Sequence, residues 1–355
     1  MDNNSAIKRF DWIDIAKGIG MLLVIIGHCS IGRYCDIIFS FHMPLFFICS
    51  GFTLRVSQTV EDFKKKTKRG FLYLMGNAFG IFLVQNILEI VFSTEERSTS
   101  GNILGFLSEF LLEFIGGSGT GITFGSKTFA GIGIVWFLMA LFWGRTIFDF
   151  LQLKCKRKVV FFLSIVIISV VGYVLGNIQW LPMSIDIAFV IQPFFLFGYV
   201  LKEVDLEKRL LLVCAGSLIG WLTFLIFLGI VQEVVLELVY RSYPLYPLCI
   251  ACAMLGSMFI IGLGIVMNKY LKVPSIPLKI LGKHSILMIW VHGLDLYVPF
   301  IKKITIATGN GYVNAMIRVL VDCSIFVMVL LLKKLFRNWK MSHVPIESKR
   351  NQTKV

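Results

Sequence analysis

The sequence has 355 residues, of which 57% are apolar and only 16% are charged, and its mean hydropathy is +0.80. These values exclude an ordinary soluble domain, in which roughly 25% of residues are charged. The net charge of +14 is spread over many short segments, and this scatter argues against a nucleic-acid-binding protein.

Hydrophobic runs of about 20 residues recur along the whole chain, and each can cross a bilayer core of roughly 30 Å as a helix. The alternation of a membrane β-barrel is absent, so we predict an all-α, polytopic transmembrane helix bundle. The ten predicted spans cover residues 13–31, 36–56, 71–92, 129–151, 159–176, 183–201, 210–231, 247–267, 284–304 and 313–332. We expect one integral membrane domain over residues 1–332 and a basic cytoplasmic tail over residues 333–355.

The distribution of basic residues predicts the orientation of these spans. With the N-terminus in the cytoplasm, 26 of the 35 Lys and Arg residues lie inside, seven lie outside and two lie within helices. This asymmetry follows the positive-inside rule and places both termini in the cytoplasm. The first span carries charged residues and lacks a small-residue cleavage site, so we expect no cleavable signal peptide.

The first predicted helix carries three polar residues that are costly within a membrane: Asp14, Lys17 and His28. Lys17 and His28 are eleven residues apart, which places them within about 20° of one helix face and about 16 Å apart along the axis. Asp14 lies one turn before Lys17 on nearly the same stripe. One face of this helix therefore carries polar groups from the inner interface toward the outer side.

The second predicted helix carries His42 followed by Pro44. His28 and His42 are expected at a similar depth on either side of a short turn, where an imidazole can take a proton from an alcohol. We also expect Pro44 to leave a carbonyl near His42 without its helical hydrogen bond. The alternative is that Asp14 and Lys17 only neutralise each other and that the histidines donate to nearby carbonyls.

The segment from 93 to 128 is the longest break between spans, and a loop of this length is usually functional or disordered. Residues 102–115 are apolar and suit a short helix in the outer interface. This segment is either a lid over an acceptor site or a simple spacer.

Three later residues are candidates for binding a substrate: Trp136, Asp186 and His292. Trp136 lies near the outer end of the fourth span, where interfacial anchoring is the alternative role. Asp186 begins the sixth span and Asp295 follows His292 by one turn, and solvation of a helix end explains both acids equally well. No cluster with metal-ligand spacing appears, so we expect no metal.

The opening motifs carry a resemblance to a known family. Asp14 to His28 reads D-x-x-K-G-I-x-x-x-L-V-x-x-G-H, and Phe39 to Phe52 reads F-S-F-H-M-P-L-F-F-x-x-S-G-F. The chain thereby resembles the acyltransferase 3 family, especially its fucose 4-O-acetylase-like branch. Weaker matches follow in the same order along the chain, at Lys64 to Arg69, Trp136 to Leu138, Pro193 to Tyr199, and Leu281 to Ser285 leading to His292.

The resemblance implies a cytoplasmic acyl-CoA donor, an acceptor hydroxyl on the far side of the membrane, and a catalytic histidine at the position of His28. Many relatives carry Arg eleven residues before that histidine. Lys17 stands there in this sequence, so the positive charge is kept but the bidentate fork is not. The expected catalytic residues are therefore His28, His42, Lys17 and Asp14.

The basic stretch after the second span is the expected site for the phosphates of acetyl-CoA. Charge-assisted hydrogen bonds would hold the phosphates, and contact with lipid headgroups is the alternative role. The predicted cofactor-binding residues are Lys64, Lys65, Lys66, Lys68 and Arg69.

The sequence thus predicts a membrane-bound O-acyltransferase, most simply an O-acetyltransferase, that acts on an extracytoplasmic carbohydrate or glycoconjugate. Membrane lipid is an expected partner and nucleic acid is not. A multi-pass transporter is one alternative, although the inverted repeats and discontinuous helices of such proteins are not visible in the sequence. A non-catalytic membrane sensor is another.

Overall fold

The computed structural model describes residues 10–29, 31–92, 103–124, 127–230 and 236–342. About 80% of the described residues are helical, and the predicted all-α fold is confirmed. The principal helices are α1 (Asp11–Gly27), α2 (Arg33–Phe39), α3 (His42–Thr53), α4 (Val60–Gly70), α5 (Gly76–Phe92), α6 (Ile103–Gly116), α7 (Trp136–Lys154), α8 (Lys158–Ile178), α9 (Ile185–Val190), α10 (Gln192–Leu201), α11 (Ser217–Ile230), α12 (Leu248–Tyr270), α13 (Ile276–Lys283), α14 (Ser285–Leu294), α15 (Pro299–Thr305) and α16 (Gly311–Ser342).

Seven helices in the described part of the chain are long and apolar enough to cross a membrane, and up to nine spans result if each of two bent pairs is one span. The two halves of each pair meet at 53° between α9 and α10 and at 90° between the α14 segment and α15. Helix α1, the first of the ten predicted spans, has 17 residues and a length of about 25 Å. The number ten and the orientation of the termini remain predictions.

The division into a membrane domain and a tail also remains a prediction. Helix α16 continues through residue 332 to Ser342, so the first part of the predicted tail prolongs the last helix. Residues 343–355 lie outside the described residues.

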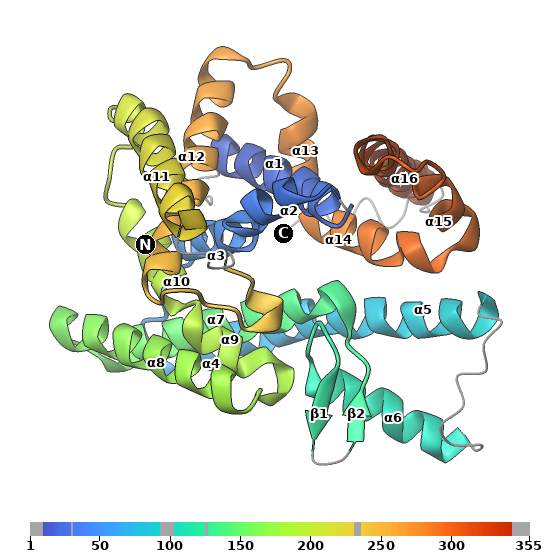
Figure 1. Cartoon of the computed structure of the whole chain (residues 1–355), viewed down its shortest axis with the longest axis horizontal. Coiled ribbons are helices and arrows are strands. Elements are labelled where there is room, and N and C mark those ends of the chain that lie inside the picture. The colour runs from blue at the N-terminus through green and yellow to red at the C-terminus, as the bar shows by residue number, and fades with distance from the viewer. Residues whose placement is uncertain (1–9, 30, 93–102, 125–126, 231–235, 343–355) are drawn as a thin grey trace.

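Helices α1, α2 and α3 lie in the centre of the molecule, with α11 to α13 on one side and α7 to α9 on the other (Figure 1). Glycines let the neighbouring backbones approach α1 closely. A methyl group added to Gly18 would overlap with the carbonyl of Leu278 in α13, and one added to Gly282 would overlap with the carbonyl of Asp14. This contact holds α1 against α13, because only residues without a side chain fit there.

A second glycine contact holds α3 against α10. A methyl group added to Gly198 would overlap with the carbonyl of Ile48, and one added to Gly51 would overlap with the carbonyl of Phe195. Gly198 and Gly282 belong to two of the weaker motif matches in the sequence. These motifs therefore mark the packing surfaces that hold α1 and α3.

The second predicted span breaks into α2 and α3 at Ser40 and Phe41. Pro44 lies in the first turn of α3, where a backbone N–H has no helical partner in any case. We expected Pro44 to remove a hydrogen bond from the middle of a helix and so leave a carbonyl free near His42. Because the helix is already broken before His42, Pro44 removes no such bond. The break itself starts α3 at His42.

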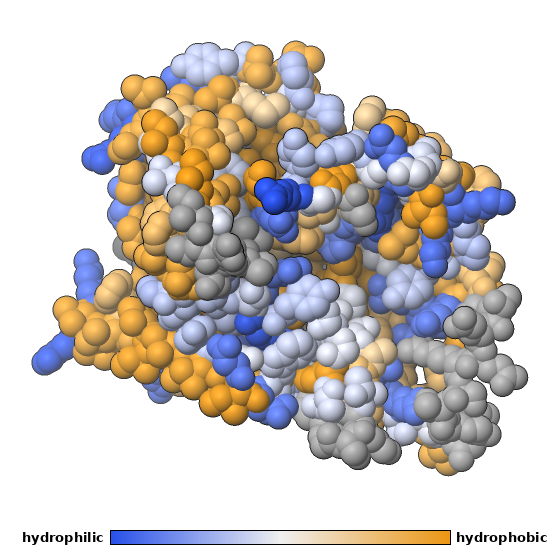
Figure 2. All heavy atoms as spheres, in the orientation of Figure 1, coloured by the Kyte–Doolittle hydropathy of each residue, from blue (hydrophilic) through white to orange (hydrophobic). Residues whose placement is uncertain are grey.

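The long segment before α7 forms helix α6 and a two-stranded antiparallel hairpin of β1 (Ile122–Phe124) and β2 (Lys127–Phe129). The predicted short helix is present, whereas the hairpin was not predicted. Hydrophobic residues gather along the rim of the face seen in Figure 2, over α8 and α11, and hydrophilic residues gather near its middle. This distribution suits a helix bundle whose periphery meets lipid.

Candidate active site

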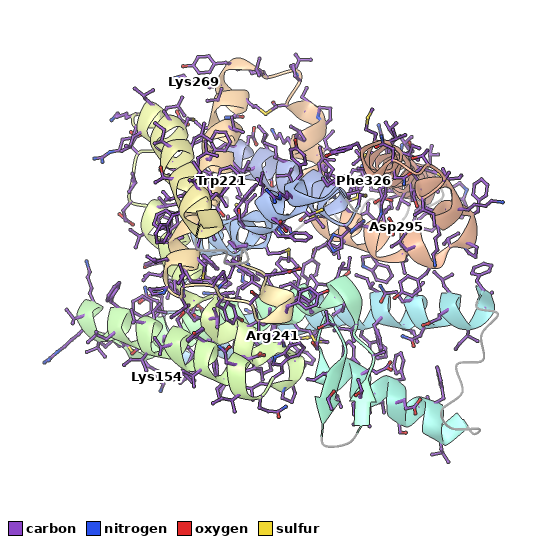
Figure 3. The ribbon with its side chains drawn as sticks, viewed as in Figure 1. Lys154, Trp221, Arg241, Lys269, Asp295 and Phe326 are labelled. Carbon is purple, nitrogen blue, oxygen red and sulfur yellow. The ribbon has the colours of Figure 1, made fainter. Side chains whose placement is uncertain are left out.

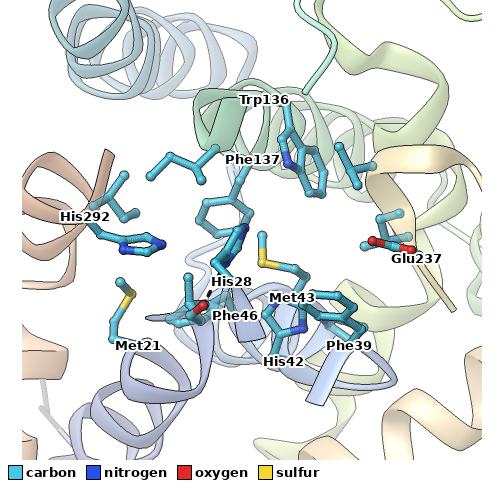
Figure 4. Close-up of a pocket in the computed structure, with 16 residues that line it drawn as sticks. Met21, His28, Phe39, His42, Met43, Phe46, Trp136, Phe137, Glu237 and His292 are labelled. Carbon is cyan, nitrogen blue, oxygen red and sulfur yellow. Dashed lines mark hydrogen bonds between the residues drawn. The ribbon is translucent and has the colours of Figure 1, made fainter. Parts of the chain in front are cut away.

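A pocket of about 80 Å³ lies among α1, α3, α7, α14 and the segment before α12. Three imidazoles line it, from His28, His42 and His292, and Figure 4 shows them in one cavity with aromatic and sulfur-bearing side chains. We call it the histidine pocket. Its lining residues are Met21, Val24, His28, Phe39, His42, Met43, Pro44, Phe46, Ile134, Trp136, Phe137, Glu237, Leu238, Val239, Ile289 and His292.

His28 follows the last residue of α1, and its ring is held by the helix it ends. Its Nδ1 lies 2.7 Å from the carbonyl oxygen of Val24. Because a carbonyl only accepts hydrogen bonds, Nδ1 carries the proton and Nε2 keeps a free electron pair in the neutral ring. His28 can therefore take a proton from a group in the pocket.

His42 begins α3 and has a similar arrangement, with its Nδ1 3.1 Å from the carbonyl oxygen of Ile38. The ring of Phe39 contacts both histidines, with ring centroids 6.2 Å from His28 and 5.2 Å from His42. The prediction that His28 and His42 meet in one cavity is thus consistent with the structure. The histidines do donate to nearby carbonyls, as the alternative reading of the sequence expected, but each still offers Nε2.

His292 of α14 has the closest ring contact to His28, with ring centroids 5.2 Å apart. Its Nδ1 lies 3.2 Å from a carboxylate oxygen of Asp322 in α16 and 3.5 Å from Asp295. Asp295 also accepts two hydrogen bonds from Arg318, at 2.6 and 2.9 Å. Arg318 in turn donates to the backbone carbonyl of His28, so a buried chain of charges links the two histidines.

Ligand atoms of His292, Asp295 and Asp322 lie within 4.8 Å of one another, close enough to hold a metal ion. Arg318, however, donates to both carboxylate oxygens of Asp295. A guanidinium in this position competes with a cation for the same oxygens. The three side chains could hold a metal ion, and Arg318 opposes one. The expectation that the protein needs no metal remains a prediction.

A second and larger cavity of about 1140 Å³ opens on the other side of the same helices. We call it the basic cavity, because seven of its lining residues are Lys or Arg: Lys17, Arg55, Lys66, Arg69, Arg145, Lys283 and Lys333. Asp14 also lines it, and its carboxylate lies 3.7 Å from the ammonium of Lys17. The stripe predicted along α1 thus begins in the basic cavity and ends at the histidine pocket.

The predicted cluster for acetyl-CoA is only partly at the basic cavity. Lys66 and Arg69 line it, whereas Lys64, Lys65 and Lys68 do not. Helix α4 explains the difference, because Lys66 and Arg69 are three residues apart and share one face. The other three side chains are exposed to solvent.

Arg145 and Asp149 are four residues apart on α7, but each forms its hydrogen bonds with a serine from another segment. Arg145 donates to the hydroxyl of Ser50 at 3.2 Å. Asp149 accepts from the backbone N–H and the hydroxyl of Ser57, at 2.7 and 2.6 Å. Asp149 is used to fix the segment after α3, so the charge of Arg145 faces the basic cavity.

Three side chains line both cavities: Phe46, Phe137 and Ile289. The rings of Phe46 and Phe137 are in contact, with centroids 5.7 Å apart. We call these three residues the septum. These three side chains stand where the two cavities are adjacent.

Of the three residues predicted to bind a substrate, two line the histidine pocket and one does not. Trp136 and His292 line the histidine pocket. Asp186 does not, because it is buried and accepts hydrogen bonds from Arg241 at 2.8 and 3.3 Å. Figure 3 shows Arg241 well apart from Asp295, so the two buried ion pairs occupy different parts of the molecule.

Sequence reasoning missed Asp322 and Glu237. Asp322 lies within the predicted span 313–332, where an intramembrane acid is a signal for function, but no motif matches this run. Glu237 lies between two spans, where a carboxylate is common, and no local signal marks it. Packing between distant segments brings Glu237 into the pocket lining and Asp322 against His292.

A family model described as an acyltransferase domain matches residues 10–336. Comparisons with curated proteins and with solved structures find no match. The resemblance seen in the opening motifs is therefore confirmed at the level of the family, while the fucose 4-O-acetylase-like branch remains a prediction. Since the match covers nearly the whole chain, the protein belongs to the acyltransferase 3 family and is a multi-pass membrane acyltransferase.

Proposed function

We propose that this protein is a membrane-bound O-acetyltransferase that moves an acetyl group from cytoplasmic acetyl-CoA to a hydroxyl of an extracytoplasmic carbohydrate or glycoconjugate. The observation that carries the proposal is the pairing of two cavities across one septum. One cavity is rich in cations, the other holds three imidazoles, and Phe46, Phe137 and Ile289 line both.

The basic cavity suits the donor. Coenzyme A carries several phosphate charges, which bind best to Lys and Arg side chains through charge-assisted hydrogen bonds. Lys66, Arg69 and Arg145 supply such groups at different points of the cavity. The positive-inside distribution favours a cytoplasmic opening for this cavity, and the acetyl thioester would then reach the septum from that side.

The histidine pocket suits the chemistry. In the proposed reaction, Nε2 of His28 takes the proton of the acceptor hydroxyl while the hydroxyl oxygen attacks the thioester carbonyl. A carbon–oxygen bond forms, the carbon–sulfur bond breaks, and the departing thiolate takes the proton back from His28. The products are an O-acetyl ester and free coenzyme A, and His28 returns to its starting state.

His292 and Asp322 would support the proton transfer. The imidazolium that forms at His28 gains from a nearby carboxylate, and the chain from His292 to Asp322 and Asp295 supplies negative charge behind it. A covalent acetyl-His28 intermediate is the alternative order of events. Release of one equivalent of coenzyme A in the absence of an acceptor would distinguish it from direct transfer.

The test is acetyl transfer by purified His28→Ala, measured as free thiol released from acetyl-CoA in the presence of an acceptor. We expect kcat to fall by about 10²- to 10⁴-fold, the usual contribution of a general base. His343→Ala, outside the described residues, is the control and should keep full activity. Full turnover by a correctly inserted His28→Ala protein would remove His28 from the mechanism.

A further inference from the structure

Among the described residues that line the histidine pocket, Glu237 is the one with an acidic side chain. None of the pocket-lining residues in the described part of the chain is Lys or Arg. Figure 4 shows the carboxylate of Glu237 on the opposite side of the cavity from His292, with the Trp136 ring above. A molecule seated beside His28 would therefore meet a carboxylate and an indole rather than a cation.

The carboxylate of Glu237 is half-buried, and no hydrogen bond or ion pair to it is found among the described residues. Its backbone is nevertheless fixed, because Glu237 and Ser242 exchange two backbone hydrogen bonds of 3.0 and 3.1 Å. Burial and the nearby charge of Asp36 raise the pKa of Glu237 above its usual value. A half-buried carboxylate without a partner gains from a ligand that donates hydrogen bonds.

The segment that carries Glu237 is anchored by a buried ion pair. Arg241 is held by Asp186 through its Nε at 2.8 Å and also donates to the hydroxyl of Ser118. The guanidinium lies over the ring of Trp180, 4.1 Å from its centroid. These contacts fix the segment from two sides, so the position of Glu237 in the pocket is set before a ligand arrives.

We propose that Glu237 and Trp136 form the acceptor subsite and select a neutral sugar ring that presents hydroxyl groups beside the one that reacts. This inference rests on the proposed function. A carboxylate accepts hydrogen bonds from two neighbouring hydroxyls, and an indole face packs against the C–H groups of a sugar ring. Sugars that carry a carboxylate or a phosphate are repelled, because the pocket offers them no cation.

The experiment uses the purified full chain, acetyl-CoA and a panel of acceptors. The neutral acceptors are methyl α-D-glucopyranoside and methyl α-D-galactopyranoside, and the charged ones are the matching methyl uronates. We expect the wild type to acetylate the neutral glycosides only. In Glu237→Gln the KM for these glycosides should rise about 10- to 100-fold, as expected when a hydrogen bond to a charged group is lost, while the KM for acetyl-CoA stays unchanged.

Asp36→Asn is the matched control. Asp36 is exposed, lies near Glu237 and does not line the pocket, so this variant removes the same charge nearby without touching the subsite. It should change the acceptor KM less than twofold. Glu237→Lys should in addition gain activity on the uronates, because the sign of the charge in the pocket is reversed.

The outcomes separate this inference from the function it rests on. No coenzyme A release with any acceptor contradicts the acetyltransferase function itself. Transfer by the wild type with an unchanged acceptor KM in Glu237→Gln overturns the subsite alone. Wild-type transfer to uronates in preference to neutral glycosides overturns it as well.

Discussion

The histidine pocket and the basic cavity share a septum but differ in charge. Seven Lys or Arg residues line the basic cavity, whereas the described lining of the histidine pocket has none. The two arginines beside the pocket, Arg241 and Arg318, are each held by an aspartate. Lys17 and Lys66 in the basic cavity are also paired, with Asp14 and Asp62, but its lining keeps an excess of positive charge. The difference teaches that excess positive charge is kept on one side of the septum, which suits a polyanionic donor there and an uncharged acceptor on the other.

The largest effect that would test this division is expected in the basic cavity. In the double variant Lys66→Ala and Arg69→Ala, two cations that face the cavity are lost. We expect the KM for acetyl-CoA to rise about 100-fold, since each hydrogen bond between charged groups contributes roughly 1.5 to 3 kcal/mol. Steady-state kinetics at varied acetyl-CoA would measure it, and the acceptor KM should not change.

The double variant Lys64→Ala and Lys65→Ala removes the same number of charges from the same helix. These side chains are exposed and do not line the cavity. It should leave the KM for acetyl-CoA within about twofold of the wild type, since exposed charges interact weakly through water. Equal losses in both double variants would mean that the charge of α4 acts as a whole, for example by holding lipid headgroups.

A smaller effect is expected from the carboxylate behind His292. Asp322 lies 3.2 Å from the Nδ1 of His292, and Asp322→Asn keeps the size of the side chain but removes its charge. We expect kcat to fall about tenfold, below the usual range for a base that acts on the substrate itself, with both KM values unchanged. Cys323→Ser, on the same turn of α16, is the control and should retain the wild-type kcat.

A rise in KM for acetyl-CoA in Asp322→Asn, with kcat unchanged, would contradict this arrangement. It would mean that the acid shapes the path of the donor and has no part in the proton transfer. A change in kcat alone would therefore assign Asp322 to the chemistry in the histidine pocket, and a change in the KM for acetyl-CoA alone would assign it to donor binding.

The sequence predicted what depends on local pattern. Hydrophobic runs gave the all-α fold, and the eleven-residue spacing of Lys17 and His28 placed polar groups along one face of α1, between the two cavities. The motif around His42 led to the same pocket. These features were readable because they lie on two helices joined by a short turn, where position along the chain determines position in space.

Features that depend on contacts between distant segments were not predictable. Arg145 and Asp149 have a spacing typical of a pair, yet Arg145 donates to Ser50 and Asp149 accepts from Ser57. Asp186 faces Arg241 instead of a substrate, because the segment before α12 folds back onto α9. A sequence pattern identifies which residues are polar, but the competing partners come from elsewhere in the fold.

The smallest expected effect concerns the septum. Phe137 contacts the rings of Phe46 and Phe47, at 5.7 and 5.3 Å between centroids, and it lines both cavities. In Phe137→Leu the passage widens, so a longer acyl group fits near His28. We expect the ratio of butyryl to acetyl transfer, measured with the two acyl-CoA donors in competition, to rise roughly fivefold, because added methylenes are excluded by limited space.

Phe142→Leu provides the matched control on the same helix. Phe142 is buried and lines the basic cavity but not the histidine pocket, so its replacement enlarges the cavity without opening the septum. Selection of acyl length at the septum requires the ratio to change in Phe137→Leu alone. An equal rise of the butyryl-to-acetyl ratio in both variants would mean that acyl length is selected in the basic cavity. The septum would then separate the two cavities without selecting the acyl group.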